Sequence, residues 1–219
     1  FFEGEKNAEY RVLRAVKNRF GSTNEMGLFE MRDTGLVDVP DASKLFLSER
    51  EADTGTVIVP TVEGTRPLLV ELQALVAKTP YVPPRRTSDA VDIKRLQLLL
   101  AVLEKRVGFK LMQKDVFINI AGGLRVTDLA IDLSVIAAVL SSNVDTPIET
   151  GWCMTGEVGL SGEVRPVSRI EQRIAEAEKL GFSHLILPKY NLQGLDSSKY
   201  KIELHPVRKV EEALRVLFG

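Results

Sequence analysis

One segment near the middle of the chain constrains the fold more than any other. Residues 129–140 read Leu-Ala-Ile-Asp-Leu-Ser-Val-Ile-Ala-Ala-Val-Leu, an almost uninterrupted apolar run. A helix that is apolar all round is buried all round, and this run is too short for a membrane span, which needs about 20 residues. The sequence therefore predicts a helix over 129–140 in the middle of a domain, with Thr127 or Asp128 as its N-cap.

The residues around that segment are typical of a mixed α/β (α+β) domain. Apolar runs of strand length occur at 57–62, 66–76, 116–120, 152–154, 164–167 and 182–187. Apolar residues at helical spacing predict helices over 93–107, 170–180 and 210–218. Residues 80–88 are expected to form an extended loop and 156–163 a glycine-rich hairpin. Ser168-Arg169-Ile170-Glu171 has the pattern of a capping box.

The first fifty residues follow a different pattern. Tyr10–Phe20 alternates apolar and charged side chains, Gly21–Asn24 is turn-like, and Met26–Met31 can return as a second strand. A two-stranded ribbon is only marginally stable alone, so it should pack on something else. Residues 41–51 are polar and turn-rich, which indicates a linker with a helical turn at Ser43–Leu47. One continuous domain is then expected over 52–219.

Composition excludes several classes of protein. Lys and Arg number 29 and Asp and Glu 30, so the net charge is −1, and 44% of residues are hydrophobic. This balance is that of a globular chain with a sizeable core, not of a membrane protein or a disordered tail. The single cysteine, Cys153, excludes an internal disulfide and a four-cysteine zinc site. The start of the chain has no signal-peptide pattern and no initiator Met, so we expect a fragment.

Few residues suggest catalysis by themselves. The glycines at 122–123 and 156–162 do not fit a phosphate-binding loop and are better interpreted as tight turns. His184 lies in an apolar strand and His205 precedes Pro206 in an expected loop, neither with an obvious Ser or Cys partner. Asp128 and Asp132 would share a helix face, where capping is a simpler role for Asp128 than acid–base chemistry. Cys153 is typical of a small buried hydrophobe.

Basic charge gathers in one window. Between residues 83 and 115, eight basic residues face four acidic ones. Lys94 and Lys105 are eleven residues apart, and Arg95 and Arg106 repeat that spacing, so the two pairs would lie on similar helix faces about 16 Å apart. Such an array can follow a phosphate backbone, or it can be a solvated helix with charged ends. The DNA-binding candidates are Arg85, Arg86, Lys94, Arg95, Lys105 and Arg106.

Several ordered strings add a family resemblance. They are Phe2-Glu3-Gly4-Glu5, Tyr10–Arg14, the KNRFG motif Lys17-Asn18-Arg19-Phe20-Gly21, Glu63–Pro67, Leu103–Arg106, Ala121–Gly123, Gly156–Glu163 and Arg169–Arg173. Together they resemble the C-terminal part of the bacterial RadA (Sms) family of DNA repair proteins, along essentially the whole chain.

The resemblance implies an architecture. Members of the family carry a four-cysteine zinc finger, a RecA-like ATPase core and a Lon-protease-like domain of the ribosomal-S5-domain-2 type. This chain would then hold the last strands of the core with KNRFG (1–40), a linker (41–51) and the Lon-like domain (52–219). The zinc finger and the Walker motifs are not in the sequence, so no cofactor and no ATP hydrolysis are expected of this chain alone. ATP, Mg²⁺ and Zn²⁺ belong to the full-length family.

The resemblance also implies function. The family acts as a DNA-dependent ATPase and hexameric ring helicase in the bacterial cytoplasm, promoting branch migration of recombination intermediates. Its partners are RecA recombinase and duplex, branched or single-stranded DNA. The resemblance implies no contact with a membrane. KNRFG is linked there to ATP hydrolysis. Lys17 and Arg19, two apart on a strand, would point to the same side and could reach one phosphate-bearing ligand.

The Lon-like resemblance does not extend to peptidase chemistry. Lon-type enzymes use a Ser in a Gly-Pro-Ser-Ala-Gly turn and a Lys on a later helix. Here residues 122–130 contain no serine, the next serine is Ser134, and Glu171 stands where the Lys is expected. We therefore expect a ring scaffold that also binds duplex DNA. The alternatives are a purely structural oligomerisation module, with DNA contacts only in the missing core, and a residual Lon-type peptidase.

Overall fold

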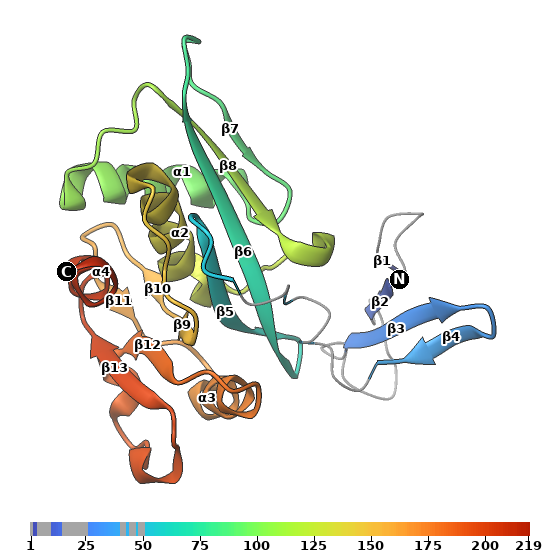
Figure 1. The fold of residues 1–219 in the computed structure, drawn as a ribbon. Coiled ribbons are helices and arrows are strands. Elements are labelled where there is room, and N and C mark those ends of the chain that lie inside the picture. Colours follow the sequence, from blue (N-terminus) through green and yellow to red (C-terminus); the bar gives the residue numbers. More distant parts are fainter. Residues whose placement is uncertain (1, 4–9, 15–25, 40–42, 44–46, 48–50) are drawn as a thin grey trace.

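The computed structural model describes residues 2–3, 10–14, 26–39, 43, 47 and 51–219. Two β-sheets are visible in Figure 1, a small one formed by the first part of the chain and a large one that carries the helices. The small sheet is antiparallel, in the order β1 (Phe2–Glu3), β2 (Tyr10–Arg14), β3 (Met26–Arg32) and β4 (Gly35–Asp38). Strand β3 confirms the predicted return strand, and β4 was not expected. The predicted turn at Gly21–Asn24 lies outside the described residues.

The large sheet has seven strands and is mixed. Its order is β13 (Glu203–Val207), β12 (His184–Pro188), β9 (Trp152–Met154), β5 (Thr56–Glu63), β6 (Arg66–Lys78), β8 (Lys114–Ile120) and β7 (Arg86–Ser88). Strands β13, β12, β9 and β5 run parallel, β5–β6 and β6–β8 are antiparallel, and β7 is parallel to β8. A separate short hairpin pairs β10 (Glu157–Val158) with β11 (Val164–Arg165), as the glycine pattern predicts.

The helices cover both faces of the large sheet. Helices α1 (Ile93–Val102), α2 (Asp132–Val144) and α4 (Val210–Phe218) contribute to the main hydrophobic core on one face. Helix α3 (Ile170–Lys179) packs on the other face, against a second cluster that contains Leu69, Cys153 and Leu185. The described residues therefore form a mixed α/β fold, which confirms that part of the expectation. None of the described helices is long and apolar enough to cross a membrane.

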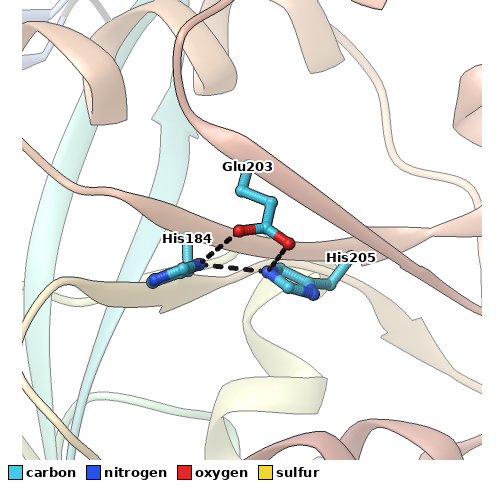
Figure 2. A group of neighbouring side chains, drawn as sticks. All are labelled: His184, Glu203 and His205. Atoms are coloured by element: carbon cyan, nitrogen blue, oxygen red, sulfur yellow. Dashed lines mark hydrogen bonds and ion pairs between the residues drawn. The ribbon is translucent and has the colours of Figure 1, made fainter.

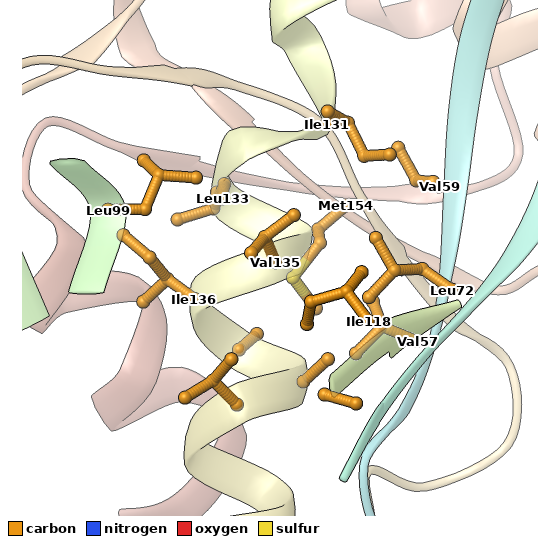
Figure 3. Packing of buried hydrophobic residues seen from close by; sticks show 14 of the residues in the cluster. Val57, Val59, Leu72, Leu99, Ile118, Ile131, Leu133, Val135, Ile136 and Met154 are labelled. Atoms are coloured by element: carbon orange, nitrogen blue, oxygen red, sulfur yellow. The ribbon is translucent and has the colours of Figure 1, made fainter. Parts of the chain in front are cut away.

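Helix α2 is the buried centre of this fold. Every residue from Asp132 to Ser141 is buried, and Figure 3 shows Leu133, Val135 and Ile136 packed among side chains of the sheet and of α1. Asp128 caps the short 3-10 turn Leu129–Ile131 that leads into α2, and its side chain accepts from the Ala130 N–H at 3.1 Å. The predicted central helix and its Asp128 cap are confirmed.

Three local expectations are wrong. The loop expected over 80–88 ends in the edge strand β7, and His205 lies in edge strand β13 rather than in a loop. The capping box at 168–171 does not form. The N-cap of α3 is Arg169, in a left-handed conformation with φ +54°, and it makes no side-chain capping bond. Helix α3 therefore begins one residue later than a Ser168 cap requires, and the Ser168 carbonyl accepts from the Arg173 guanidinium at 2.9 Å.

The expected linker is tied to the large domain at Ser43. This side chain is fully buried, donates to Glu176 on α3 at 2.8 Å and accepts from the Leu69 N–H at 3.1 Å. Residues 44–46, in the expected helical turn, lie outside the described residues. Arg66 also donates to the Val39 carbonyl at 2.8 Å, so the end of the small sheet contacts the start of β6.

Candidate nucleic-acid interface

The basic window is organised around α1. Asp92 caps this helix by accepting from the Arg95 N–H at 2.9 Å. The helix continues as a π-helical turn over Leu103–Val107 and ends at Gly108, whose φ is +89°. The predicted helix over 93–107 and its glycine stop are confirmed. Because a π turn holds more residues than an α turn, Lys105 and Arg106 are rotated from the positions that a uniform 3.6-residue period predicts.

Two of the six DNA-binding candidates are engaged inside the protein. Arg95 makes a bidentate contact with the buried carboxylate of Asp132, with Nε to Oδ1 at 3.0 Å, and donates to the Val158 carbonyl at 2.9 Å. The hydrogen bond to Asp132 raises the pKa of Arg95. Arg86 donates to the carbonyls of Lys114 and Leu111. Both guanidinium groups already hold the fold together, which leaves them fewer donors for phosphate.

The other four candidates are exposed. Lys94 lies near the start of α1, and Lys105 and Arg106 lie in the π turn at its end. Arg85 lies over the ring of Tyr81, 4.7 Å from its centre. Arg106 Nε is 3.4 Å from the Leu160 carbonyl, so one donor of its guanidinium reaches the β10–β11 turn. The structure therefore keeps a basic residue exposed at each end of the helix.

The structure brings another cation to the same turn. Lys209 Nζ donates to the Ser161 carbonyl at 3.2 Å, beside the contact of Arg106 with Leu160. Sequence reasoning missed Lys209 because it lies about a hundred residues beyond the basic window. The only sequence signal is the adjacent pair Arg208-Lys209 just before α4.

A groove beside the start of α1 is less suited to phosphate. Its charged lining residues are Arg95, Arg125, Asp89, Asp92, Asp128 and Asp132. Carboxylates outnumber guanidinium groups there, and Arg95 is paired with Asp132. A polyanion would be repelled from this groove, so any DNA contact should follow the exposed ends of the helix instead.

Asp128 and Asp132 do not form an acid–base pair, because each is held by a different arginine. Asp128 forms an ion pair with Arg173 at 2.7 Å and accepts from the Val62 N–H at 3.0 Å. Burial disfavours the charged form of Asp128, but its hydrogen bond and ion pair with Arg173 outweigh this and hold the pKa of the carboxyl below its usual range. Burial raises the pKa of Asp132 despite its contact with Arg95.

The groups that could act as nucleophiles near α2 have structural partners. The Ser134 hydroxyl is buried and donates to the Met154 carbonyl at 3.1 Å. The Thr155 hydroxyl is buried and lies 3.4 Å from the Ala130 carbonyl. Cys153 is also buried, as expected for a small hydrophobe, and burial raises the pKa of its thiol. These contacts do not support a peptidase. The KNRFG motif, Lys17–Gly21, lies outside the described residues.

Comparison with known proteins decides the family. Over 220 aligned residues and all of this chain, the sequence is 52% identical to the DNA repair protein RadA of Bacillus subtilis. The chain belongs to the RadA family of DNA repair proteins. It is also 49% identical to RadA of Halalkalibacterium halodurans and 48% identical to RadA of Streptococcus pneumoniae, again over its whole length.

The match covers only part of each relative. The chain spans 48% of the Bacillus and Halalkalibacterium RadA proteins and 52% of the Streptococcus pneumoniae protein, about half their length. A family model, subunit ChlI of Mg-chelatase, matches residues 89–191, which include α1, the central helix α2 and α3. The resemblance to the RadA family inferred from KNRFG and the later strings is confirmed.

Proposed function

We propose that this chain is the ring-assembly and duplex-DNA-binding part of a RadA-type DNA repair protein. The observation that carries the proposal is the match to RadA proteins along the entire chain. The exposed cations at the two ends of α1, Lys94 on one side and Lys105 with Arg106 on the other, supply the charge that contacts with phosphates need. The near-neutral net charge agrees with a local rather than a global binding surface.

In this proposal the two sheets belong to different domains. Residues 1–40 are the last strands of a RecA-like ATPase core, 41–51 a linker and 52–219 a Lon-protease-like domain of the ribosomal-S5-domain-2 type. The full-length protein would act as a DNA-dependent ATPase and ring helicase beside RecA recombinase in the bacterial cytoplasm. Lys17 and Arg19 of KNRFG would serve ATP hydrolysis there, with ATP and Mg²⁺ bound by the part of the protein that this chain lacks.

Reversing two charges should test the DNA surface. The variant Lys94→Glu with Lys105→Glu is expected to bind a short DNA duplex at least about tenfold more weakly than the wild type at low salt. The slope of log affinity against log salt should fall by about 2, because two phosphate contacts are lost. Fluorescence anisotropy of a labelled duplex, measured over a salt series, gives both quantities.

A matched control uses two exposed lysines on other elements. Lys189 follows β12 and Lys201 precedes β13, and both are exposed. Lys189→Glu with Lys201→Glu therefore changes the net charge by the same amount at a different place. If both double variants weaken binding equally, the effect is one of total charge and the α1 surface is not the DNA site. Wild-type affinity in the Lys94→Glu, Lys105→Glu variant would also remove this site from the proposal.

Assembly can be measured separately from DNA binding. Multi-angle light scattering of the chain, alone and with a duplex, is expected to show a hexamer-sized species that binds the duplex at low salt. Rings that do not bind DNA would favour the alternative of a structural oligomerisation module. The contacts of Arg86 and Arg95 inside the protein are the observation that favours this alternative. A monomer at all protein concentrations would contradict the scaffold role.

A further inference from the structure

The two histidines of the chain meet at the edge of the large sheet. The sequence contains only two histidines, 21 residues apart, and they lie on the adjacent parallel strands β12 and β13. His184 is opposite Glu203 in the strand register, and His205 follows Glu203 by two residues and so lies on the same face. Figure 2 shows the three side chains converging. The Glu-Leu-His string in an edge strand is the sequence signal that could have indicated this cluster.

The distances within the cluster are those of ligands around one small ion. His184 Nδ1 is 3.2 Å from His205 Nε2 and 3.4 Å from Glu203 Oε2, and His205 Nε2 is 3.6 Å from Glu203 Oε1. Zinc binds imidazole nitrogen and carboxylate oxygen at about 2.0–2.2 Å in tetrahedral geometry. Two ligand atoms at those bond lengths are about 3.4 Å apart. The three observed separations bracket this value.

The surroundings hold the imidazoles and leave one side open. The Trp152 ring stacks on His184 at 4.4 Å between ring centres, with 17° between the planes, and lies 4.7 Å from His205. The side chain of Glu203 is 66% exposed and that of His184 32%. Three protein ligands with solvent access match a site whose remaining position is taken by water.

We propose that His184, Glu203 and His205 bind a divalent transition-metal ion, with zinc as the best fit. Two imidazoles and one carboxylate are ligands that zinc uses, whereas Mg²⁺ prefers a shell of oxygen atoms. The ion would join edge strand β13 to β12 and thereby stabilise the end of the sheet. The three ligands form the only possible metal-binding group of three or more His, Cys, Asp or Glu side chains in the described part of the chain.

The chain carries its own reporter for this site. Trp152 is the only tryptophan and contacts both histidines, so its fluorescence should change when an ion binds. The tag-free 219-residue chain, first dialysed against a chelator, would be titrated with ZnCl₂, CoCl₂ and MgCl₂. We expect saturable 1:1 binding of Zn²⁺, visible absorption of tetrahedral Co²⁺ and no response to Mg²⁺. The melting temperature should rise in Zn²⁺ and return to its starting value with chelator.

Three variants decide whether these residues are the ligands. His184→Gln and His205→Gln should each weaken Zn²⁺ binding by at least about tenfold, since loss of even an indirect partner of a metal typically costs 10–100-fold. Glu171→Gln, an exposed acid on α3 across the sheet, should leave binding unchanged. The melting temperature of each variant in chelator checks that it is folded. Unchanged affinity in both histidine variants, or no Zn²⁺ response in the wild type, would overturn the proposal. DNA binding plays no part in the test.

Discussion

Replacing Arg173 with methionine is expected to lower the free energy of unfolding by about 3–5 kcal/mol, the usual cost of breaking a buried ion pair from one side. The Arg173 side chain is fully buried. It forms an ion pair with Asp128 at 2.7 Å and donates to the carbonyls of Pro60 at 2.8 Å and Ser168 at 2.9 Å. Methionine would leave the carboxylate and both carbonyls without these donors. Urea unfolding followed by far-UV circular dichroism measures the loss.

Two further variants separate burial from charge. Arg165→Met removes an arginine that is 52% exposed and paired with Glu163, and should lower the free energy of unfolding far less than Arg173→Met does. Asp128→Asn in the Arg173→Met background removes the unpaired charge while keeping an oxygen for the cap, and should restore part of the stability. Equal losses for Arg173→Met and Arg165→Met would contradict the role of burial.

The same pair predicts how stability responds to acid. Arg173 holds the folded pKa of Asp128 below its ordinary value of 3.8. The stability that the ionised Asp128 contributes is therefore present above about pH 4. It is lost as the pH falls through the lower folded pKa. In Arg173→Met the buried carboxyl is unpaired, and protonation relieves it. The difference in unfolding free energy between wild type and variant should therefore shrink from pH 7 towards pH 3, and a constant difference would contradict this account.

Leu133→Ala should destabilise the fold by about 3–5 kcal/mol through a cavity beside α2. Leu133 is fully buried and lies among Leu99 and the other core residues in Figure 3. Helix α1 and strand β10 pack against α2, and Gly156 lies beside Leu133, so the lost volume is enclosed by packed elements. Thermal or urea unfolding gives the change in free energy.

The controls for this prediction use the same chemistry at other exposures. Leu98→Ala, on the outer side of α1 with 44% exposure, should change the free energy of unfolding by less than about 0.5 kcal/mol. Leu133→Met conserves volume and should cost less than about 1.5 kcal/mol. A small effect of Leu133→Ala would contradict the conclusion that packing around α2 contributes strongly to the stability of the core.

The elements that the sequence predicted well are those with a strong local signal. The apolar run at 129–140 could only be a buried helix, and Asp128 is its cap in the structure. The 3,4 spacing that ends at Gly108 and the amphipathic pattern of 210–218 were equally local. The family was also readable from the sequence, because its strings of residues occur in order along the chain.

Apart from the local strand β4, the failures depended on contacts between distant residues. The Ser168–Glu171 string has the pattern of a capping box, yet α3 is preceded by Arg169 as its N-cap, and the buried Arg173 joins the Ser168 carbonyl to that of Pro60, over a hundred residues earlier. Edge strand β7 exists only because β8 pairs with it. Arg86 and Arg95 looked like surface charges, and the structure uses them to satisfy carbonyls and a buried carboxylate.

By itself, the sequence determined the buried central helix, the α/β class, the family and the local basic window, because periodicity, capping residues and ordered strings are properties of neighbours along the chain. Only the tertiary structure decided which arginines remain exposed, that Lys209 joins Arg106 at one turn, and that His184 meets His205 across two strands. Burial and pairing are set by which strands and helices pack together, and no local window contains that information.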